Sequence, residues 1–265
     1  MGPVTQVETI ARTGYFARGI VYVLLGYFAL TTRGVAEEGT TGLFQQIREA
    51  PAGTILLVPL AVGLAAYGIF RLYTAVIDLD LSGKGWKEKG KRIGHFASGL
   101  AHMGLAAGAV MLAFGGKAQQ GGDQQEKAQM VLDLPFGDVL LGIVGIGFLL
   151  AALEQAKNAW TAKFVYQMAA DTPAFAKPVG RMGYGARSVV FVIIGIAIIR
   201  AAWFHHSSEV KGLGGALSEL SQHDLLYSII AAGIALFGIF CLIYGKYRRI
   251  RIDDVIEKLK SIAPG

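Results

Sequence analysis

The chain has 265 residues, of which 53% are hydrophobic and only 17% are charged. A soluble domain carries roughly a quarter charged residues, so this composition excludes an ordinary soluble protein and favours one that spans a membrane. The net charge of +6 would suggest a nucleic-acid partner in a soluble chain, but here the positive-inside rule explains it better, so no nucleic acid is expected.

Six apolar segments are long enough to cross a bilayer as helices, which takes roughly 20 residues each. In chain order they cover 14–32, 54–77, 94–114, 136–160, 183–204 and 225–244. They are continuous apolar runs without the alternation of a membrane strand. The predicted fold class is therefore an all-α polytopic membrane protein with six transmembrane helices.

A short motif, Arg-x-Gly-Tyr-x-Ala-Arg, opens the first, third and fifth segments. The middle copy has His95 in place of the Tyr and Ser98 in place of the second Arg. Self-similarity at this spacing indicates repeated supersecondary units. We predict one membrane domain of three two-helix repeats and a C-terminal amphipathic tail, at 10–80, 90–162, 179–248 and 249–265.

The second helices of the repeats also align. Gly63, Tyr67 and Arg71 of repeat one correspond to Gly147, Ala151 and Gln155 of repeat two, and to Gly233, Phe237 and Cys241 of repeat three. Because each repeat crosses twice, the repeats run parallel, related by an axis along the membrane normal. Three such units most simply close into a six-helix ring with pseudo-threefold symmetry.

The loops between the two helices of each repeat contain apolar residues at helical spacing. These are Leu43, Phe44 and Ile47, then Met130, Val131 and Leu134, then Leu213, Leu217 and Leu220. We expect three short helices on the outer side, which either lie in the membrane interface or pack on the bundle as lids.

The recurring motif, the second-helix pattern of Pro-x-Gly followed by apolar residues, and the threefold repetition together resemble the bacterial membrane family of the domain of unknown function numbered 1206. The resemblance covers roughly 10–248. It implies a six-helix protein of the bacterial inner membrane, and it implies no activity.

Positive residues collect on one side of the predicted bundle. All but six of the 25 Lys and Arg residues lie in, or next to, the two termini, the 78–93 loop and the 161–182 loop. The positive-inside rule therefore predicts a multi-pass protein of the bacterial inner (plasma) membrane with its N- and C-termini in the cytoplasm.

The motif places arginines at equivalent positions near this side, and they are the candidate ligand-binding residues. Arg12, Arg92 and Arg181 open the helices, and Arg18 and Arg187 lie about a turn and a half deeper. Tyr15, His95 and Tyr184 form an aromatic level between them. A basic collar would suit a phosphate, a lipid head group or a carboxylate, because guanidinium forms bidentate hydrogen bonds. The alternative is that these residues only fix topology and anchor the interface.

Of the charged residues and histidines within the predicted spans, Arg71, His102 and Glu154 lie furthest from the span ends. Intramembrane ionisable groups are functional candidates. Glu154 is expected to face the bundle and to pair with Arg71, Arg18, Arg187 or the nearby Lys157. A structural salt bridge and a proton or substrate relay are both compatible with that expectation. For His102 the expectation is a neutral ring hydrogen-bonded to a neighbouring helix.

No catalytic set, nucleotide-binding loop or metal-ligand cluster appears in the sequence, so neither enzymatic activity nor a cofactor nor a metal is expected. Three functions remain. The first is a membrane module that binds a lipid or anionic ligand at the Arg collar. The second is a channel or transporter along the pseudo-threefold axis, and the third is an accessory subunit of a larger complex. Expected partners are anionic membrane lipids, with a homo-oligomer or a partner membrane protein as further alternatives.

Overall fold

The computed structural model describes residues 3–32, 39–77, 85–116 and 122–249. Within these ranges, six helices are long and apolar enough to cross a membrane, as the sequence predicts. They are α1 (Pro3–Thr31), α4 (Gly53–Ile77), α5 (Trp86–Ala113), α7 (Gly137–Thr161), α8 (Ala176–Phe204) and α10 (Asp224–Tyr247). The protein is therefore an all-α, multi-pass membrane protein built from three two-helix repeats, α1 with α4, α5 with α7, and α8 with α10.

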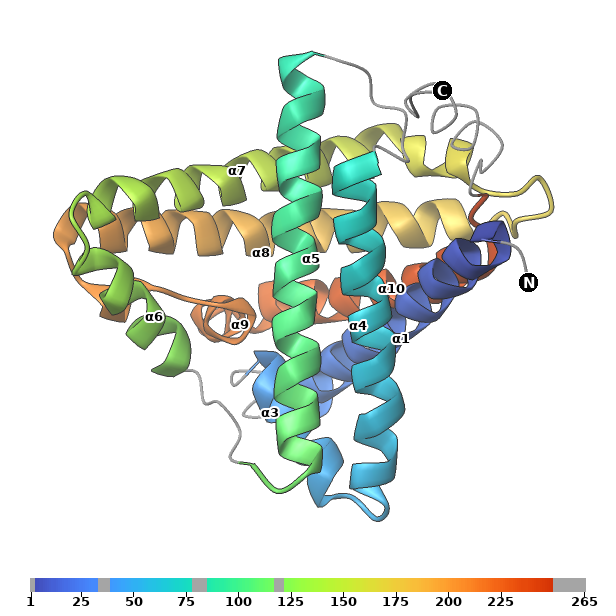
Figure 1. The fold of residues 1–265 in the computed structure, drawn as a ribbon, viewed down its shortest axis with the longest axis horizontal. Helices are drawn as coiled ribbons and strands as arrows, with labels where there is room; N and C mark the ends of the chain where they lie inside the picture. The colour runs from blue at the N-terminus through green and yellow to red at the C-terminus, as the bar shows by residue number, and fades with distance from the viewer. Residues whose placement is uncertain (1–2, 33–38, 78–84, 117–121, 250–265) are drawn as a thin grey trace, which may run out of the picture.

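The repeats meet one another in a threefold pattern. The second helix of each repeat packs along the first helix of the next, as α4 with α5, α7 with α8, and α10 with α1 (Figure 1). Close approaches occur at equivalent residues, Gly68 with Gly99 and Gly19 with Gly238, because neither residue of each pair has a side chain. At the third equivalent pair, the Ser188 hydroxyl donates a hydrogen bond to the Ala152 carbonyl oxygen at 2.9 Å.

The predicted ring is open at one place. Within repeats one and three the two helices pack on each other, α1 with α4 and α8 with α10, but α5 and α7 of repeat two form no extended contact. The six helices therefore follow the order α5, α4, α1, α10, α8, α7 from one edge to the other. Figure 1 shows the α4–α5 pair standing across the α7–α8 pair, with α1 and α10 behind them.

The three short outer helices are present, as α3 (Gly39–Glu49), α6 (Gly122–Leu132) and α9 (Leu213–Leu220). Two of them are lids rather than interfacial helices, because Leu43 and Phe44 of α3 and Leu217 and Leu220 of α9 are buried in the core. Helix α6 differs: Met130, on its predicted apolar face, is 60% exposed.

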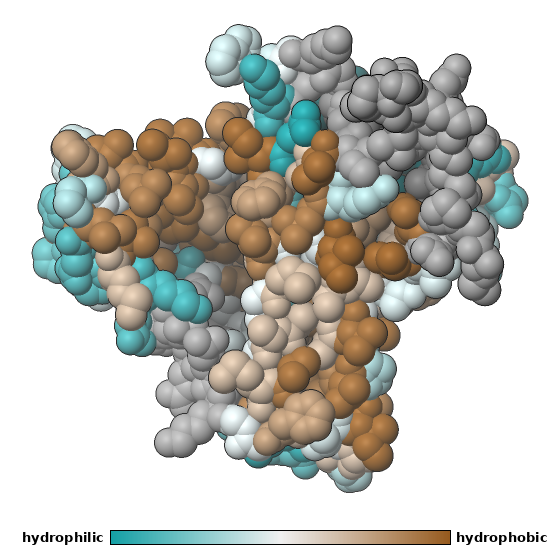
Figure 2. Space-filling model, in the orientation of Figure 1, coloured by the Kyte–Doolittle hydropathy of each residue, from teal (hydrophilic) through white to brown (hydrophobic). Residues whose placement is uncertain are grey.

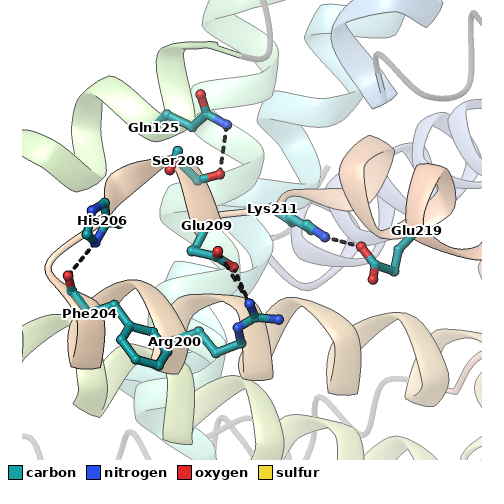
Figure 3. Close-up of polar contacts among 8 residues, drawn as sticks. All are labelled: Gln125, Arg200, Phe204, His206, Ser208, Glu209, Lys211 and Glu219. Carbon is teal, nitrogen blue, oxygen red and sulfur yellow. Dashed lines mark hydrogen bonds and ion pairs between the residues drawn. The ribbon is translucent and has the colours of Figure 1, made fainter.

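Polar contacts tie these outer elements together (Figure 3). Gln125 of α6 donates to the main-chain carbonyl of Ser208 in η2 (Ser207–Glu209) at 3.3 Å. Arg200 of α8 forms an ion pair with Glu209 at 3.2 Å, and Lys211 donates to Glu219 of α9. The outer end of the bundle is thereby covered.

The opposite end, where α1 begins and α10 ends, is called the basic end below. The 161–182 segment, predicted only as a loop, contains a 3-10 helix, η1 (Lys163–Gln167), which places the buried Phe164 ring between Tyr184 and Phe240. Just after α10, Arg248 is buried and donates to the Tyr15 hydroxyl. Side chains thus fill this end as well; the predicted tail at 249–265 lies outside the described residues beyond Arg249.

Candidate functional site

Two buried arginines lie near the middle of the bundle. Arg18 and Arg187 are 8% and 7% exposed, respectively. The predicted spans began at 14 and 183, but α1 begins at Pro3 and α8 at Ala176. Arg187 is consequently about three turns into its helix, and Arg18 about four. The two arginines are therefore further from the helix starts than predicted, and burial of their side chains inside the bundle keeps them from extending along the helix to its end.

Aromatic rings surround both guanidinium groups. The Arg18 guanidinium carbon lies 5.5 Å from the ring centroid of Tyr22 and 4.9 Å from that of Phe237. The Arg187 carbon lies 5.5 Å and 4.3 Å from the same two centroids. Because both groups contact the same rings, they occupy one shared site, to which Phe191 adds a further ring contact with Arg187 at 4.7 Å.

Tyr67 of α4 joins further polar groups to this site. Its hydroxyl accepts a hydrogen bond from Arg18, whose guanidinium carbon lies 4.8 Å from the Tyr67 ring centroid. Arg71 lies 5.8 Å from the same centroid. The His102 ring packs on Tyr67 with 4.5 Å between centroids, and its Nδ1 donates to the Ser98 carbonyl at 2.7 Å, within its own helix rather than across helices as expected.

The positive charges in this site lack an anionic partner. Among the described residues, no carboxylate forms an ion pair with Arg18, Arg71 or Arg187, and the Nε atom of each is buried without a hydrogen-bond partner. Burying a charged side chain costs several kcal/mol even after the protein relaxes. A desolvated cation–π contact offsets about 2 kcal/mol. The rings therefore compensate part of this desolvation cost, but they do not compensate the mutual repulsion of the positive charges.

Repeat two adds no charged side chain at the positions equivalent to those of the site. At the position of Arg18 and Arg187 it has Ser98, and at the position of Tyr67 and Phe237 it has Ala151. Its Gln155, equivalent to Arg71, accepts a hydrogen bond from Arg187 at 3.5 Å. Two repeats thus supply charge and aromatic surface, and the third supplies small or uncharged groups.

The other three arginines of the predicted collar have a different position. Arg92 donates to the carbonyls of Ala75 and Val76, which end α4. Arg181 donates to the Ala159 carbonyl near the end of α7 at 2.8 Å, and Arg12 donates to the Lys246 carbonyl near the end of α10. Each therefore satisfies free carbonyls, and the negative dipole end, of the second helix that packs beside it, α4, α7 or α10.

The aromatic level of the prediction is divided as well. Tyr15 is buried at the basic end, where it accepts the hydrogen bond from Arg248, and Tyr184 stacks on Phe164 with 5.3 Å between centroids. The Tyr184 ring also packs on Phe237, with 5.4 Å between centroids, so it adjoins one of the two rings that both arginines contact. His95 is partly buried on α5.

Glu154 is not part of the site, contrary to the prediction that it faces the bundle. Its side chain is 49% exposed, and its partner is Lys157 on the same helix, 3.8 Å away. A carboxylate in a span is expected to turn inward, but α7 packs mainly on α8, with a smaller contact to α6, and leaves most of its surface free.

Sequence reasoning did not select the two rings shared by the arginines, Tyr22 and Phe237, or the acceptor Gln155. A signal was available, because each is the repeat equivalent of a residue that was considered: Tyr22 of His102, Phe237 of Tyr67, and Gln155 of Arg71. Arg248 is one of the positive residues near the C-terminus, and no periodicity distinguishes it from its basic neighbours there.

The threefold pattern of the site agrees with the comparison with known families. The model of the family described as Domain of Unknown Function (DUF1206) matches residues 13–78, 93–162 and 182–248. The chain belongs to this family. A DUF1206 match in three copies has the same order as the three helix pairs, so each copy of the family domain is one two-helix repeat.

A relative of this DUF1206 chain is the uncharacterised protein YxxB of Bacillus subtilis (strain 168). The two are 31% identical over 254 residues, which cover 92% of this chain and 92% of the relative. The similarity therefore extends over the whole membrane domain. No solved structure matches the chain.

Proposed function

We propose that this protein is a non-enzymatic membrane protein that binds an anionic ligand between Arg18 and Arg187. The observation that carries the proposal is the pair of buried guanidinium groups with unpartnered Nε atoms and no described carboxylate beside them. A phosphate or carboxylate group supplies the missing charge, and it can accept two parallel hydrogen bonds from one guanidinium.

Neighbouring residues support the same ligand class. Arg71 adds a third positive charge next to Tyr67, and the hydroxyl of Tyr67 lies within hydrogen-bonding range of Arg18. Gln155, which accepts the hydrogen bond from Arg187, offers an uncharged polar group that can orient a ligand without cancelling the charge that attracts it.

A channel along the pseudo-threefold axis is less well supported. Such a pore requires Glu154 and His102 to line one axis with the arginines, but Glu154 lies on the exposed side of α7. Both ends of the bundle also hold buried apolar side chains, Leu43 and Leu217 at the outer end and Phe164 and Phe240 at the basic end.

The distribution of positive charge supports an inner-membrane location with both termini in the cytoplasm, so that the basic end faces inward. In that orientation the site lies about halfway across the bilayer, below the head groups of either leaflet.

The test is native mass spectrometry of the full-length protein extracted gently from its own membrane, beside the double variant Arg18→Gln/Arg187→Gln. The wild-type protein is expected to retain an anionic molecule that the double variant loses. The matched control is Arg48→Gln/Arg200→Gln, which removes two exposed arginines at the outer end and is expected to retain the molecule. Bare protein in every sample, or equal retention by the double variant, would overturn the proposal.

A further inference from the structure

Repeats one and three close on themselves through one small-residue contact. A Cβ atom added to Gly63 would lie 2.3 Å from the Cβ of Ala17, and one added to Gly233 would lie 2.4 Å from the Cβ of Ala186. About one helical turn away, a Cβ atom added to Gly14 or Gly183 would lie 2.5 Å from the Cα of Tyr67 or Phe237, respectively. The helices can approach this far only because the glycines have no side chain.

Repeat two has the same residues at these positions, but they are apart. Gly94 and Ala97 of α5 correspond to Gly14 and Ala17, and Gly147 of α7 corresponds to Gly63. A Cβ atom added to Gly94 or Gly147 would meet nothing within 4 Å. The sequence of repeat two is therefore compatible with a closed helix pair that the open ring does not contain.

The arginine site lies behind this opening. On one side His102 of α5 packs on Tyr67, the ring that contacts Arg18, and on the other side Gln155 of α7 accepts the hydrogen bond from Arg187. Figure 2 shows a recess in the surface between the lobe that carries α7 and the central column that carries α5. The flanks of both helices expose apolar side chains, such as Phe96 and Leu150, that suit contact with lipid.

We infer that repeat two is a lateral gate through which the phosphate head group of an anionic phospholipid enters from the bilayer. This inference rests on the proposed function. Buried side chains fill both ends of the bundle, so the opening between α5 and α7 is the route that leads to the arginines. A ligand that enters from the side of a membrane protein comes from the lipid phase, and its acyl chains remain against the apolar flanks of α5 and α7.

Closure brings Gly94 and Ala97 of α5 against Gly147 and Ala151 of α7, in the geometry of repeats one and three. The closed pair leaves room for a head group, because Ser98 and Ala151 occupy positions that Arg and an aromatic residue fill in the other repeats. Repeat two, which departs from the motif, is thus the repeat whose helices can close and still leave room for the head group.

Disulfide crosslinking tests the closure. In a Cys241→Ser background, which removes the single native cysteine, Ala97→Cys and Ala151→Cys place two thiols beside the Gly94 and Gly147 contact without adding a side chain to either glycine. Oxidation in the membrane is expected to join them within one chain, and more completely when phosphatidylglycerol is present. Ser98→Cys/Ala151→Cys, at the positions equivalent to the contacting residues Arg18 and Tyr67, is a second pair for the case in which the first misfolds. Phe96→Cys/Leu150→Cys, on exposed flanks, is the control that is expected to stay reduced.

Uptake of lipid by the crosslinked protein tests the gate. Phosphatidylcholine vesicles that contain labelled phosphatidylglycerol are the probe, and native mass spectrometry measures the lipid bound. Crosslinking before exposure is expected to slow uptake at least about tenfold, as for other closing elements that admit a ligand, and reduction restores it. Crosslinking after exposure is expected to trap the labelled lipid against exchange.

Four results would overturn the inference. Two concern closure: the absence of a crosslink in both pairs, and a crosslink that joins two chains. A third is uptake of phosphatidylglycerol that crosslinking does not slow. The fourth is displacement of the lipid by inorganic phosphate equally well in crosslinked and reduced protein, because this would indicate that the ligand is a free anion from water. Failure of the proposed function is distinguishable, because then the reduced protein takes up neither phosphatidylglycerol nor phosphate.

Discussion

The Nε of Arg92 in α5 donates a hydrogen bond to the main-chain carbonyl oxygen of Ala75, 2.6 Å away near the C-terminal end of α4. This contact explains why an arginine recurs near the start of the first helix of each repeat, where it opposes the dipole of its own helix. It stabilises the end of the antiparallel neighbour instead, and the neighbour belongs to the preceding repeat.

Replacing Arg92 by Gln should therefore lower stability without affecting the site. We expect a loss of about 1 kcal/mol, because the favourable interaction of a cation with a helix C-terminus is lost along with hydrogen bonds to free carbonyls. The measurement is thermal unfolding in detergent, and Arg92→Lys should recover part of the loss. Lys91→Gln, which changes an exposed neighbour, is the control, and an equal loss in that variant would contradict the assignment.

Adding a side chain at equivalent glycines should lower stability in repeat one but not in repeat two. Gly63→Val would force a side chain against Ala17 and is expected to cost about 1–3 kcal/mol of stability, as overpacking generally does. Gly147→Val meets nothing within 4 Å and should leave the unfolding temperature unchanged. It should nevertheless prevent the closure of repeat two, which crosslinking at the second cysteine pair would detect. Equal destabilisation by both variants would show that repeat two is normally closed.

Removing one buried charge should stabilise the ligand-free protein. Arg187→Met keeps most of the side-chain volume and relieves the repulsion from Arg18. The free energy of unfolding of the delipidated variant should therefore be about 1–2 kcal/mol higher than that of the delipidated wild type. The same variant should lose the stabilisation that added anionic lipid gives to the wild type. Thermal unfolding with and without phosphatidylglycerol measures both effects. A variant that is less stable without lipid and still responds to lipid would contradict the prediction.

The lid helix α9 should respond to acid through Glu219. The hydrogen bond and positive charge of Lys211 lower the pKa of this carboxyl below its ordinary value of 4.5. Since the folded-state pKa is depressed, the stabilising contribution is present above pH 4.5 and is lost as the pH falls through the lower folded-state value. The protection factors of α9 amides, which are exchange rates corrected for the intrinsic rate at each pH, should therefore fall in that range. Glu219→Gln should show the same protection above and below it, and Lys211→Gln should remove most of the pH dependence of protection.

The helices were predictable because each apolar run is long and uninterrupted, and the repeats because Gly, Arg and the aromatic residues recur in register. The helix starts were not, since polar turns such as the one around Arg12 continue the helix by bonding to a neighbour that sequence does not reveal. Arg18 and Arg187 were identified by their recurrence. Their isolation from any described carboxylate was not, because Glu154 lies in a span at a similar depth and only packing shows that it faces outward.

The opening at repeat two could not be predicted either. Gly94, Ala97 and Gly147 carry the pattern of a close helix contact, so the sequence favours a closed ring. Whether two such faces meet depends on the packing of all six helices. Here α5 and α7 gain most of their contacts from α4 and α8, in separate repeats.

The presence of Ser98 in place of an arginine suggests what is gained by joining the three copies in one chain. A trimer of identical hairpins would hold three arginines around its axis and three identical seams, so that every seam would have the same strength. Covalent linkage allows one copy to differ from the other two. Two repeats of the site can then stay charged and closed, while the seam of repeat two, which contains Ser98, is the one that stands open.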